Sequence, residues 1–154
     1  MANEFYALLG RMRYITRWGL MRNTFSENIQ EHSHQVAVLA HALGLIRREI
    51  LGLPGPDPEK CAVAALYHDA SEILTGDLPT PIKYYNPSIK TAYKQVEKIA
   101  GEQLLDKLPP PASEGLRGLC AGGGPGCAAY RKGSRQAFGL YQMCGGAEGR
   151  KHGV

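Results

Sequence analysis

Apolar residues recur every three to four positions through the first two-thirds of the chain, a spacing that predicts amphipathic helices. An opening helix is expected over residues 4–14, with Phe5, Leu8, Leu9 and Met12 at helical spacing. A longer helix is expected over residues 28–51, because Asn28 followed by Glu31 resembles a capping box. The apolar stripe predicted to face the core from this second helix consists of Ile29, Val36, Leu39, Leu43, Ile46 and Ile50.

Two further helices begin at a capping residue followed by proline, which suits the first helical position. One starts after Asp57, turns its small residues inward and leads to the pair His68-Asp69. The other starts after Asn86 and runs to Leu108. Its expected buried face consists of Ile89, Ala92, Tyr93, Val96, Ile99 and Leu104. No alternating strand pattern is present, so the sequence predicts an all-α fold of four to five helices.

The densest group of chemically active side chains is His68, Asp69 and Glu72. An imidazole beside a carboxylate offers two ligands to a divalent metal, and a nearby glutamate can act as a base. On a continuous helix Glu72 would share a face with both residues. The same apolar stripe that predicts the second helix places His32 on its buried side, where it could meet this pair. The structural alternative for His68, Asp69 and Glu72 is a helix end with solvated polar residues. For His32 it is a histidine that only packs in the core.

Two loops carry candidate ligand-binding residues. Arg17 and Trp18 combine a guanidinium that can grip phosphate with a flat ring that can stack on a base or sugar. Residues 76–81 form a polar loop whose two prolines restrict its backbone, and Asp77 and Thr80 add an acceptor and a hydroxyl. Purely structural roles are the alternatives: Trp18 would anchor its loop to the core, and Asp77 would only form a turn.

Composition places limits on these interpretations. The chain has 154 residues, 44% of them hydrophobic, and a net charge of +4. The modest charge and the absence of a basic stripe argue against nucleic-acid polymers. No apolar run approaches a membrane span, and no signal-peptide pattern opens the chain, so we expect a cytoplasmic protein. The cysteines contain no Cys-x-x-Cys pair, and a disulfide is not expected in that compartment.

Composition also changes sharply near residue 108. Residues 109–154 hold twelve of the nineteen glycines and only two of the fourteen acidic residues. We therefore expect two parts: a helical part over residues 1–108 and a tail over residues 109–154. Glycine and scattered charges do not offset the entropy of ordering a chain, so packed structure is not expected from about residue 112 onward.

Four sequence blocks within residues 5–108 resemble the bacterial HD-domain 5′-deoxynucleotidases, which are metal-dependent phosphatases of deoxyribonucleoside 5′-monophosphates. These blocks are Arg17 to Asn23, Glu27 to Ser33, Tyr67 to Glu72 and Thr75 to Tyr84. The blocks occur in the family's order, and together they are far more specific than a His-Asp pair alone. The resemblance implies an HD-domain helical bundle that assembles as a homodimer.

The resemblance also implies roles for individual residues. His32, His68 and Asp69 would bind a divalent cation such as cobalt, manganese or zinc, with Asp69 also close to the substrate. Glu72 would orient or deprotonate the attacking water, and Arg17 would orient the phosphate. Trp18 would pack on the nucleotide. The sugar would be contacted by the loop residues Asp77, Leu78, Pro79 and Thr80.

The family's fourth metal ligand is an Asp on a later helix, and no Asp follows Asp106 here. Shifting the reading frame of residues 134–144 by one nucleotide permits a segment like the family's, so we expect the tail to be out of frame. Two alternatives to a phosphomonoesterase therefore stay open. One is an inactive truncated remnant or nucleotide-binding module, and the other is a different HD-domain phosphohydrolase.

Overall fold

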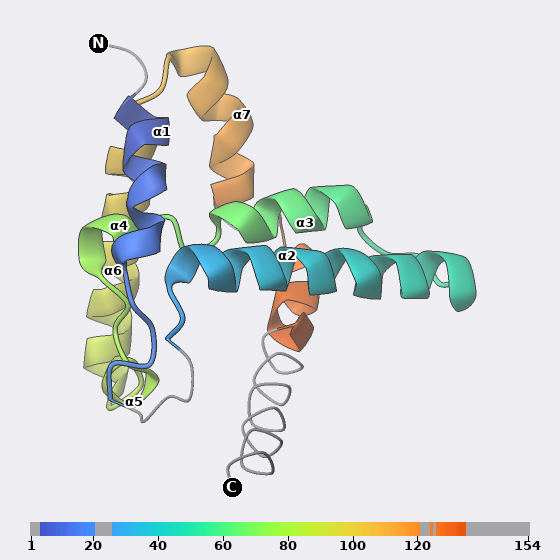
Figure 1. Cartoon of the computed structure of the whole chain (residues 1–154), viewed down its shortest axis with the longest axis horizontal. Coiled ribbons are helices and arrows are strands. Elements are labelled where there is room, and N and C mark those ends of the chain that lie inside the picture. The colour runs from blue at the N-terminus through green and yellow to red at the C-terminus, as the bar shows by residue number, and fades with distance from the viewer. Residues whose placement is uncertain (1–3, 21–25, 121–123, 125, 135–154) are drawn as a thin grey trace, which may run out of the picture.

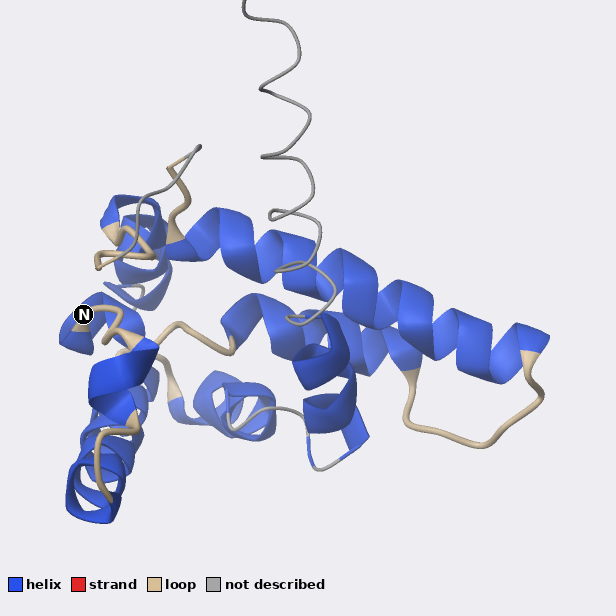
Figure 2. Cartoon of the chain, turned by 90° about the horizontal axis from the view of Figure 1, so that it is seen from below, coloured by secondary structure: helices blue, strands red, loops and turns tan. Residues whose placement is uncertain are grey.

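The computed structural model describes residues 4–20, 26–120, 124 and 126–134, and in these ranges the only regular elements are helices (Figures 1 and 2). The all-α prediction is thus confirmed. The α-helices are α1 Glu4–Leu9, α2 Ile29–Leu45, α3 Pro58–Tyr67, α4 Glu72–Thr75, α5 Thr80–Lys83, α6 Pro87–Leu105 and α7 Pro110–Cys120. A 3₁₀ turn, Gly10–Tyr14, extends α1, and a π-helical turn, Ile46–Ile50, extends α2. These seven α-helices exceed the predicted four to five because α4 and α5 are single turns of four residues each and α7 lies beyond the predicted helical part.

The predicted helix starts are confirmed by their caps. Asn28 accepts backbone N–H groups at the start of α2 and completes a capping box with Glu31. Asp57 caps α3 through the Lys60 N–H, and Asn86 caps α6 in the same way. In each case a side-chain oxygen satisfies an N–H group that has no partner within the helix.

Helices α2 and α3 lie side by side and form one core (Figure 1). Small residues allow this close approach: the packed cluster consists of Val36, Ala37, Ala40 and Ala65. Near the far end, Gly44 of α2 faces Pro58 at the start of α3. This pairing brings the first turn of α2 near the last turn of α3, where the candidate ligands lie.

A second core forms where α1 and α6 run across the direction of α2 and α3 (Figure 1). Its buried members are Phe5, Met12, Ile29, Ala70, Ile73, Leu104, Leu105 and Leu108. Ile29 lies three residues before His32, and Ala70 follows Asp69, so this core includes residues of both segments that carry the candidate ligands. Among the described residues, no helix is both long and apolar enough to cross a membrane.

Two predicted buried faces differ from the structure. Ile46 and Ile50 are exposed because α3 begins opposite Gly44 and does not reach the end of α2. In α6, Ala92, Val96 and Ile99 are exposed. Burial on α6 begins only at Ala100, since α4, α5 and α7 are its main described neighbours.

The structure also differs from the expectation that packing ends near residue 112. Helix α7 places Leu116 and Cys120 against the second core, and residues 126–134 are helical as well. Tyr130 packs on the α2–α3 core, and Cys127 forms a disulfide with Cys61 of α3. A few apolar side chains therefore anchor a glycine-rich segment that composition alone predicts to be unpacked. The prediction of no disulfide was wrong for this pair. The out-of-frame tail stays a prediction, and its residues 135–154 lie outside the described part.

Candidate active site

The candidate site begins where α3 ends. Tyr67 is the last residue of α3, residues 68–71 form a turn, and Glu72 opens α4. His68 and Glu72 therefore do not lie on one continuous helix, and the shared helix face that such a helix would give is absent at these residues. The turn folds the chain back at this point, so a buried His68-Asp69 pair and a buried Glu72 still approach the same space from two helices.

Three candidate metal ligands converge at this turn. One atom each of His32, His68 and Asp69 lies within 4.8 Å of the others. The His68 Nε2 atom lies 3.1 Å from Asp69 Oδ2, and His32 Nε2 lies 3.9 Å from the same oxygen. The His68 Nδ1 atom is 2.6 Å from the Ala65 carbonyl, which can only accept, so Nδ1 carries the proton. In the neutral ring Nε2 then presents its lone pair to the carboxylate, an arrangement that a cation between them would stabilise.

Glu27, to which sequence reasoning gave no role, contacts three of the candidate residues. It is 5% exposed, and its Oε1 lies 3.3 Å from His32 Nδ1. Its Oε2 accepts from the Trp18 indole at 2.7 Å and lies 3.4 Å from Arg17 Nε. Burial alone would raise the pKa of Glu27, but hydrogen bonds from His32 and Trp18 and the charge of Arg17 hold it below its usual range. Glu27 precedes the helix cap in a loop, so helical spacing could not reveal it.

The Arg17-Trp18 segment is held against the site. The Arg17 Nη1 atom lies 3.4 Å from Asp69 Oδ2 across 52 residues of sequence. The Arg17 guanidinium also lies 5.9 Å from the centre of the Trp18 ring. Trp18 has a φ of +63°, a conformation that costs free energy for a bulky residue. Its indole points to Glu27, and the residue does not line the pocket described next.

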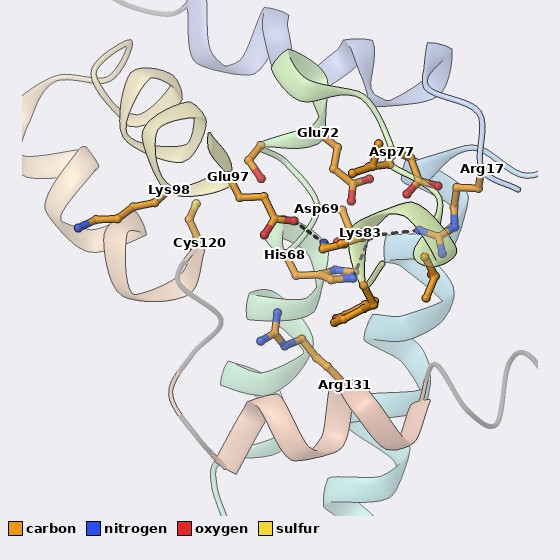
Figure 3. Close-up of a pocket in the computed structure, with 14 residues that line it drawn as sticks. Arg17, His68, Asp69, Glu72, Asp77, Lys83, Glu97, Lys98, Cys120 and Arg131 are labelled. Carbon is orange, nitrogen blue, oxygen red and sulfur yellow. Dashed lines mark hydrogen bonds and ion pairs between the residues drawn. The ribbon is translucent and has the colours of Figure 1, made fainter. Parts of the chain in front are cut away.

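A pocket of about 490 Å³ opens beside these residues (Figure 3). The predicted site residues that line it are Arg17, His68, Asp69, Glu72, Asp77, Leu78 and Thr80. Pro79 and His32 are not among the lining residues: Pro79 precedes α5, and His32 lies buried behind Asp69. In Figure 3 the Glu72 and Asp77 carboxylates point toward the same space as Asp69 and the Arg17 guanidinium. The structure thus brings two of the three metal candidates, the phosphate candidate and three of the four loop candidates to one cavity, and His32 lies next to Asp69 at its edge.

The crowding of carboxylates changes their proton affinity. Burial, with Asp69 and Asp77 nearby, raises the pKa of Glu72 to about 8. Burial also raises the pKa of Asp77, and the Asp69 charge adds to this effect. The Glu72 Oε2 atom is buried and has no hydrogen-bond partner among the described residues. Such groups favour a cation or a proton in the pocket.

Further cations line the pocket at positions for which sequence reasoning assigned no role. Lys83 forms an ion pair with Glu97 at 2.5 Å and lies 4.8 Å from the Tyr93 ring. Burial would lower the pKa of Lys83, but the hydrogen bond to Glu97 raises it, so the lysine stays charged. Arg131 and Lys98 also line the pocket. Arg131, like Tyr130 and Cys127, belongs to the segment predicted to be unpacked, and it lines the pocket.

Comparison with known proteins gives a consistent result. A model of the family described as 5′-deoxynucleotidase YfbR-like matches residues 4–122. A 5′-deoxynucleotidase of Photorhabdus laumondii is 50% identical over 115 residues, which cover 75% of this chain and 58% of that protein. A 5′-deoxynucleotidase of Vibrio cholerae is 52% identical over 115 residues, covering 75% of this chain and 59% of that protein. The chain thus spans less than two-thirds of the length of these relatives.

Solved structures agree on the fold. An HD-domain phosphohydrolase from Listeria innocua superimposes with a TM-score of 0.81 at 22% identity, covering 97% of this chain and 72% of the other. The cyanophage S-2L HD phosphohydrolase, solved with dA and one catalytic Zn²⁺, gives a TM-score of 0.53 at 25% identity. That match covers 89% of this chain and 83% of the other. The match across residues 4–122 establishes that the chain belongs to the YfbR-like 5′-deoxynucleotidase family.

Proposed function

We propose that this chain is a metal-dependent phosphomonoesterase that hydrolyses 2′-deoxyribonucleoside 5′-monophosphates to deoxynucleoside and phosphate. One observation carries the proposal: the Arg17 guanidinium and residues of the Asp77–Thr80 loop line one pocket with His68 and Asp69, and His32 completes a cluster of three candidate metal ligands with that pair. The curated relatives are named 5′-deoxynucleotidases, which supports the same substrate class.

The residues present fit a divalent cation. His32 and His68 would supply ring nitrogens and Asp69 a carboxylate oxygen, a donor set typical of zinc, cobalt or manganese sites. A cation held there supplies Lewis acidity to a phosphate oxygen and lowers the pKa of water. The phage phosphohydrolase binds one catalytic Zn²⁺, which favours zinc among these metals.

Each remaining residue has a role that follows from its position. Arg17 pairs with Asp69 at the pocket edge and would bind the phosphate oxygens, offsetting charge that develops during transfer. Glu72 is buried beside Asp69, where its carboxylate would accept a proton from the attacking water. A bound cation would lower the pKa of Glu72 and keep it ionised for this step.

The sugar would lie against the loop that follows α4. Asp77 would accept a hydrogen bond from a ribose hydroxyl, and Thr80 offers a second polar group at the same wall of the pocket. Pro79, with Leu78, would hold the loop so that the backbone lies close to the sugar. The resemblance implies that this wall binds a 3′-hydroxyl and excludes a 2′-hydroxyl, which would select deoxyribose. Trp18 does not line the pocket, so we propose that it positions Arg17 instead of packing on the nucleotide as the resemblance implies.

A second function is favoured by one specific observation. The candidate cluster among the described residues has three ligands, whereas the family pattern calls for a fourth from an Asp. A nucleotide-binding remnant that retains the pocket but hydrolyses slowly is therefore the alternative. Both functions predict cation-dependent nucleotide binding, and only the first predicts turnover.

The deciding experiment is phosphate release from deoxyadenosine 5′-monophosphate with added zinc, cobalt or manganese. We expect release that exceeds the release from adenosine 5′-monophosphate and that His68→Asn abolishes. The matched control is His34→Asn, because His34 is an exposed histidine of α2 outside the site. Binding without release by the unaltered chain would support the remnant, and equal release from both nucleotides would favour another HD-domain phosphohydrolase.

We also propose a homodimer, as the family resemblance implies, together with the cytoplasmic setting expected from the sequence. The exposed apolar residues Val96 and Ile99 of α6 are available for such an interface. Light scattering after size-exclusion chromatography would distinguish a dimer from a monomer of 16.8 kDa.

A further inference from the structure

We propose that Glu27 is a positioning residue: its one carboxylate holds a candidate metal ligand, His32, together with Arg17 and Trp18, so that the cation site and the phosphate-binding loop form as one unit. The inference deepens the proposed function and rests on it for the role of His32. Glu27 itself faces neither the pocket nor the proposed substrate.

The Glu27 carboxylate lies against the His32 ring. Both groups are almost fully buried, and Glu27 Oε1 lies 3.3 Å from His32 Nδ1. An ionised carboxylate can only accept, so the proton of the ring lies on Nδ1. In the neutral ring Nε2 is then unprotonated, and it lies 3.9 Å from Asp69 Oδ2. A carboxylate behind a histidine in this way fixes its orientation and makes it a better ligand.

Glu27 also contacts the Arg17-Trp18 loop. The other carboxylate oxygen of Glu27 accepts from the Trp18 indole at 2.7 Å and approaches Arg17 Nε at 3.4 Å. The backbone carbonyl of Glu27 also accepts the Arg17 N–H at 2.9 Å. Trp18 has a positive φ, which is unfavourable unless surrounding contacts hold it. Glu27 supplies such contacts through both its side chain and its main chain.

Glu27 takes no part in the capping box of α2. The start of α2 is already satisfied by Asn28 and Glu31, which complete a capping box without Glu27. The side chains that the Glu27 carboxylate contacts, Arg17, Trp18 and His32, instead belong to the candidate site. The buried carboxylate therefore contacts residues of the candidate site, and we expect its removal to leave the helix cap intact.

The test compares Glu27→Gln with Glu31→Gln. An amide offers one acceptor and one donor, so it cannot accept from His32 on one side and from Trp18 and Arg17 on the other. The control makes the same chemical change four residues away, where glutamine preserves a capping box. Both variants are compared with the unaltered chain in cobalt titrations followed by isothermal calorimetry.

We expect Glu27→Gln to weaken cobalt binding by about 10- to 100-fold, the usual effect of removing a carboxylate that supports a ligand. Trp18 is the only tryptophan, so its fluorescence reports the loop without a label. In the metal-free chain, Glu27→Gln should make Trp18 more accessible to acrylamide, whereas Glu31→Gln should leave both readouts unchanged. Cobalt affinity and quenching that both match the unaltered chain would overturn the proposal.

One measurement needs no variant. Nitrogen-15 spectra of the histidine rings in the unaltered, metal-free chain should show His32 with its proton on Nδ1. A proton on Nε2 alone would overturn the proposal even if Glu27→Gln failed to fold. If the unaltered chain binds cobalt but releases no phosphate, the proposed function fails. The positioning role of Glu27 is then still tested by cobalt affinity and by acrylamide quenching of Trp18. If it binds no cobalt, the metal-free readouts decide.

Discussion

The packing of α2 against α3 can be tested by adding a single methyl group, through Gly44→Ala. In a helix interior this change normally stabilises by about 1 kcal/mol, because alanine loses less conformational entropy than glycine. Here, however, the new Cβ would lie 2.8 Å from Pro58 Cβ and 3.1 Å from Pro58 Cα. Both atoms belong to a rigid ring or to backbone, so neither can rotate away.

The clash should decide whether Gly44→Ala raises or lowers the free energy of unfolding. Overpacking in a core costs about 1–3 kcal/mol, which exceeds the gain in helix propensity over most of this range. We expect Gly44→Ala to lower the free energy of unfolding by up to about 2 kcal/mol, or a few degrees in melting temperature. Because α3 carries His68 at its other end, a displaced α3 should also weaken cobalt binding.

The matched control is Gly101→Ala in α6. A Cβ at Gly101 meets nothing within 4 Å, so the same substitution should stabilise by about 1 kcal/mol. Urea unfolding followed by circular dichroism measures both variants against the unaltered chain. If Gly44→Ala stabilised the protein as much as Gly101→Ala does, the close contact between α2 and α3 would be refuted.

Three further predictions concern the cores, the disulfide and pH. Phe5→Ala should cost about 3–5 kcal/mol in urea unfolding because Phe5 is 0% exposed, whereas Tyr6→Ala, at a residue 55% exposed, should cost far less. Reducing the disulfide, whose cysteines are 66 residues apart, should cost about 4 kcal/mol by chain entropy. Cys61→Ser should remove this sensitivity to reductant, and a reductant-insensitive unaltered chain would contradict the pairing. Glu72 has a folded pKa of about 8 against an ordinary 4.5, so the metal-free chain should lose stability as pH rises through that window. The loss is at most about 5 kcal/mol, and Glu72→Gln should flatten this part of the pH profile.

Local chemistry made the helix starts predictable from sequence. Asn28, Asp57 and Asn86 each cap a helix as their side chains predict, since capping depends only on neighbouring backbone groups. The convergence of His32 with His68 and Asp69 also followed from the buried stripe of α2 and the small residues of α3. To predict this convergence it was enough to know the helical spacing of apolar residues in α2 and that α2 packs against α3.

What the sequence did not reveal depends on contacts between distant segments. Glu27 lies in a loop, and only the path of that loop brings its carboxylate to His32 and Trp18. The burial of apolar side chains on α6 depends on which other helices contact them. Val96 and Ile99 were therefore predicted to be buried but are exposed. Composition likewise missed Tyr130, because a single well-placed aromatic can anchor a segment that is polar and glycine-rich on average.

The pairing of Arg17 with Asp69 has a consequence for kinetics. The guanidinium that would bind phosphate is held, at 3.4 Å, by a carboxylate that would bind the cation. A cation at Asp69 would compete for that oxygen and repel the arginine, which then becomes available to an incoming anion. We therefore expect an ordered reaction in which metal adds before nucleotide, and in which nucleotide affinity rises once the cation is in place.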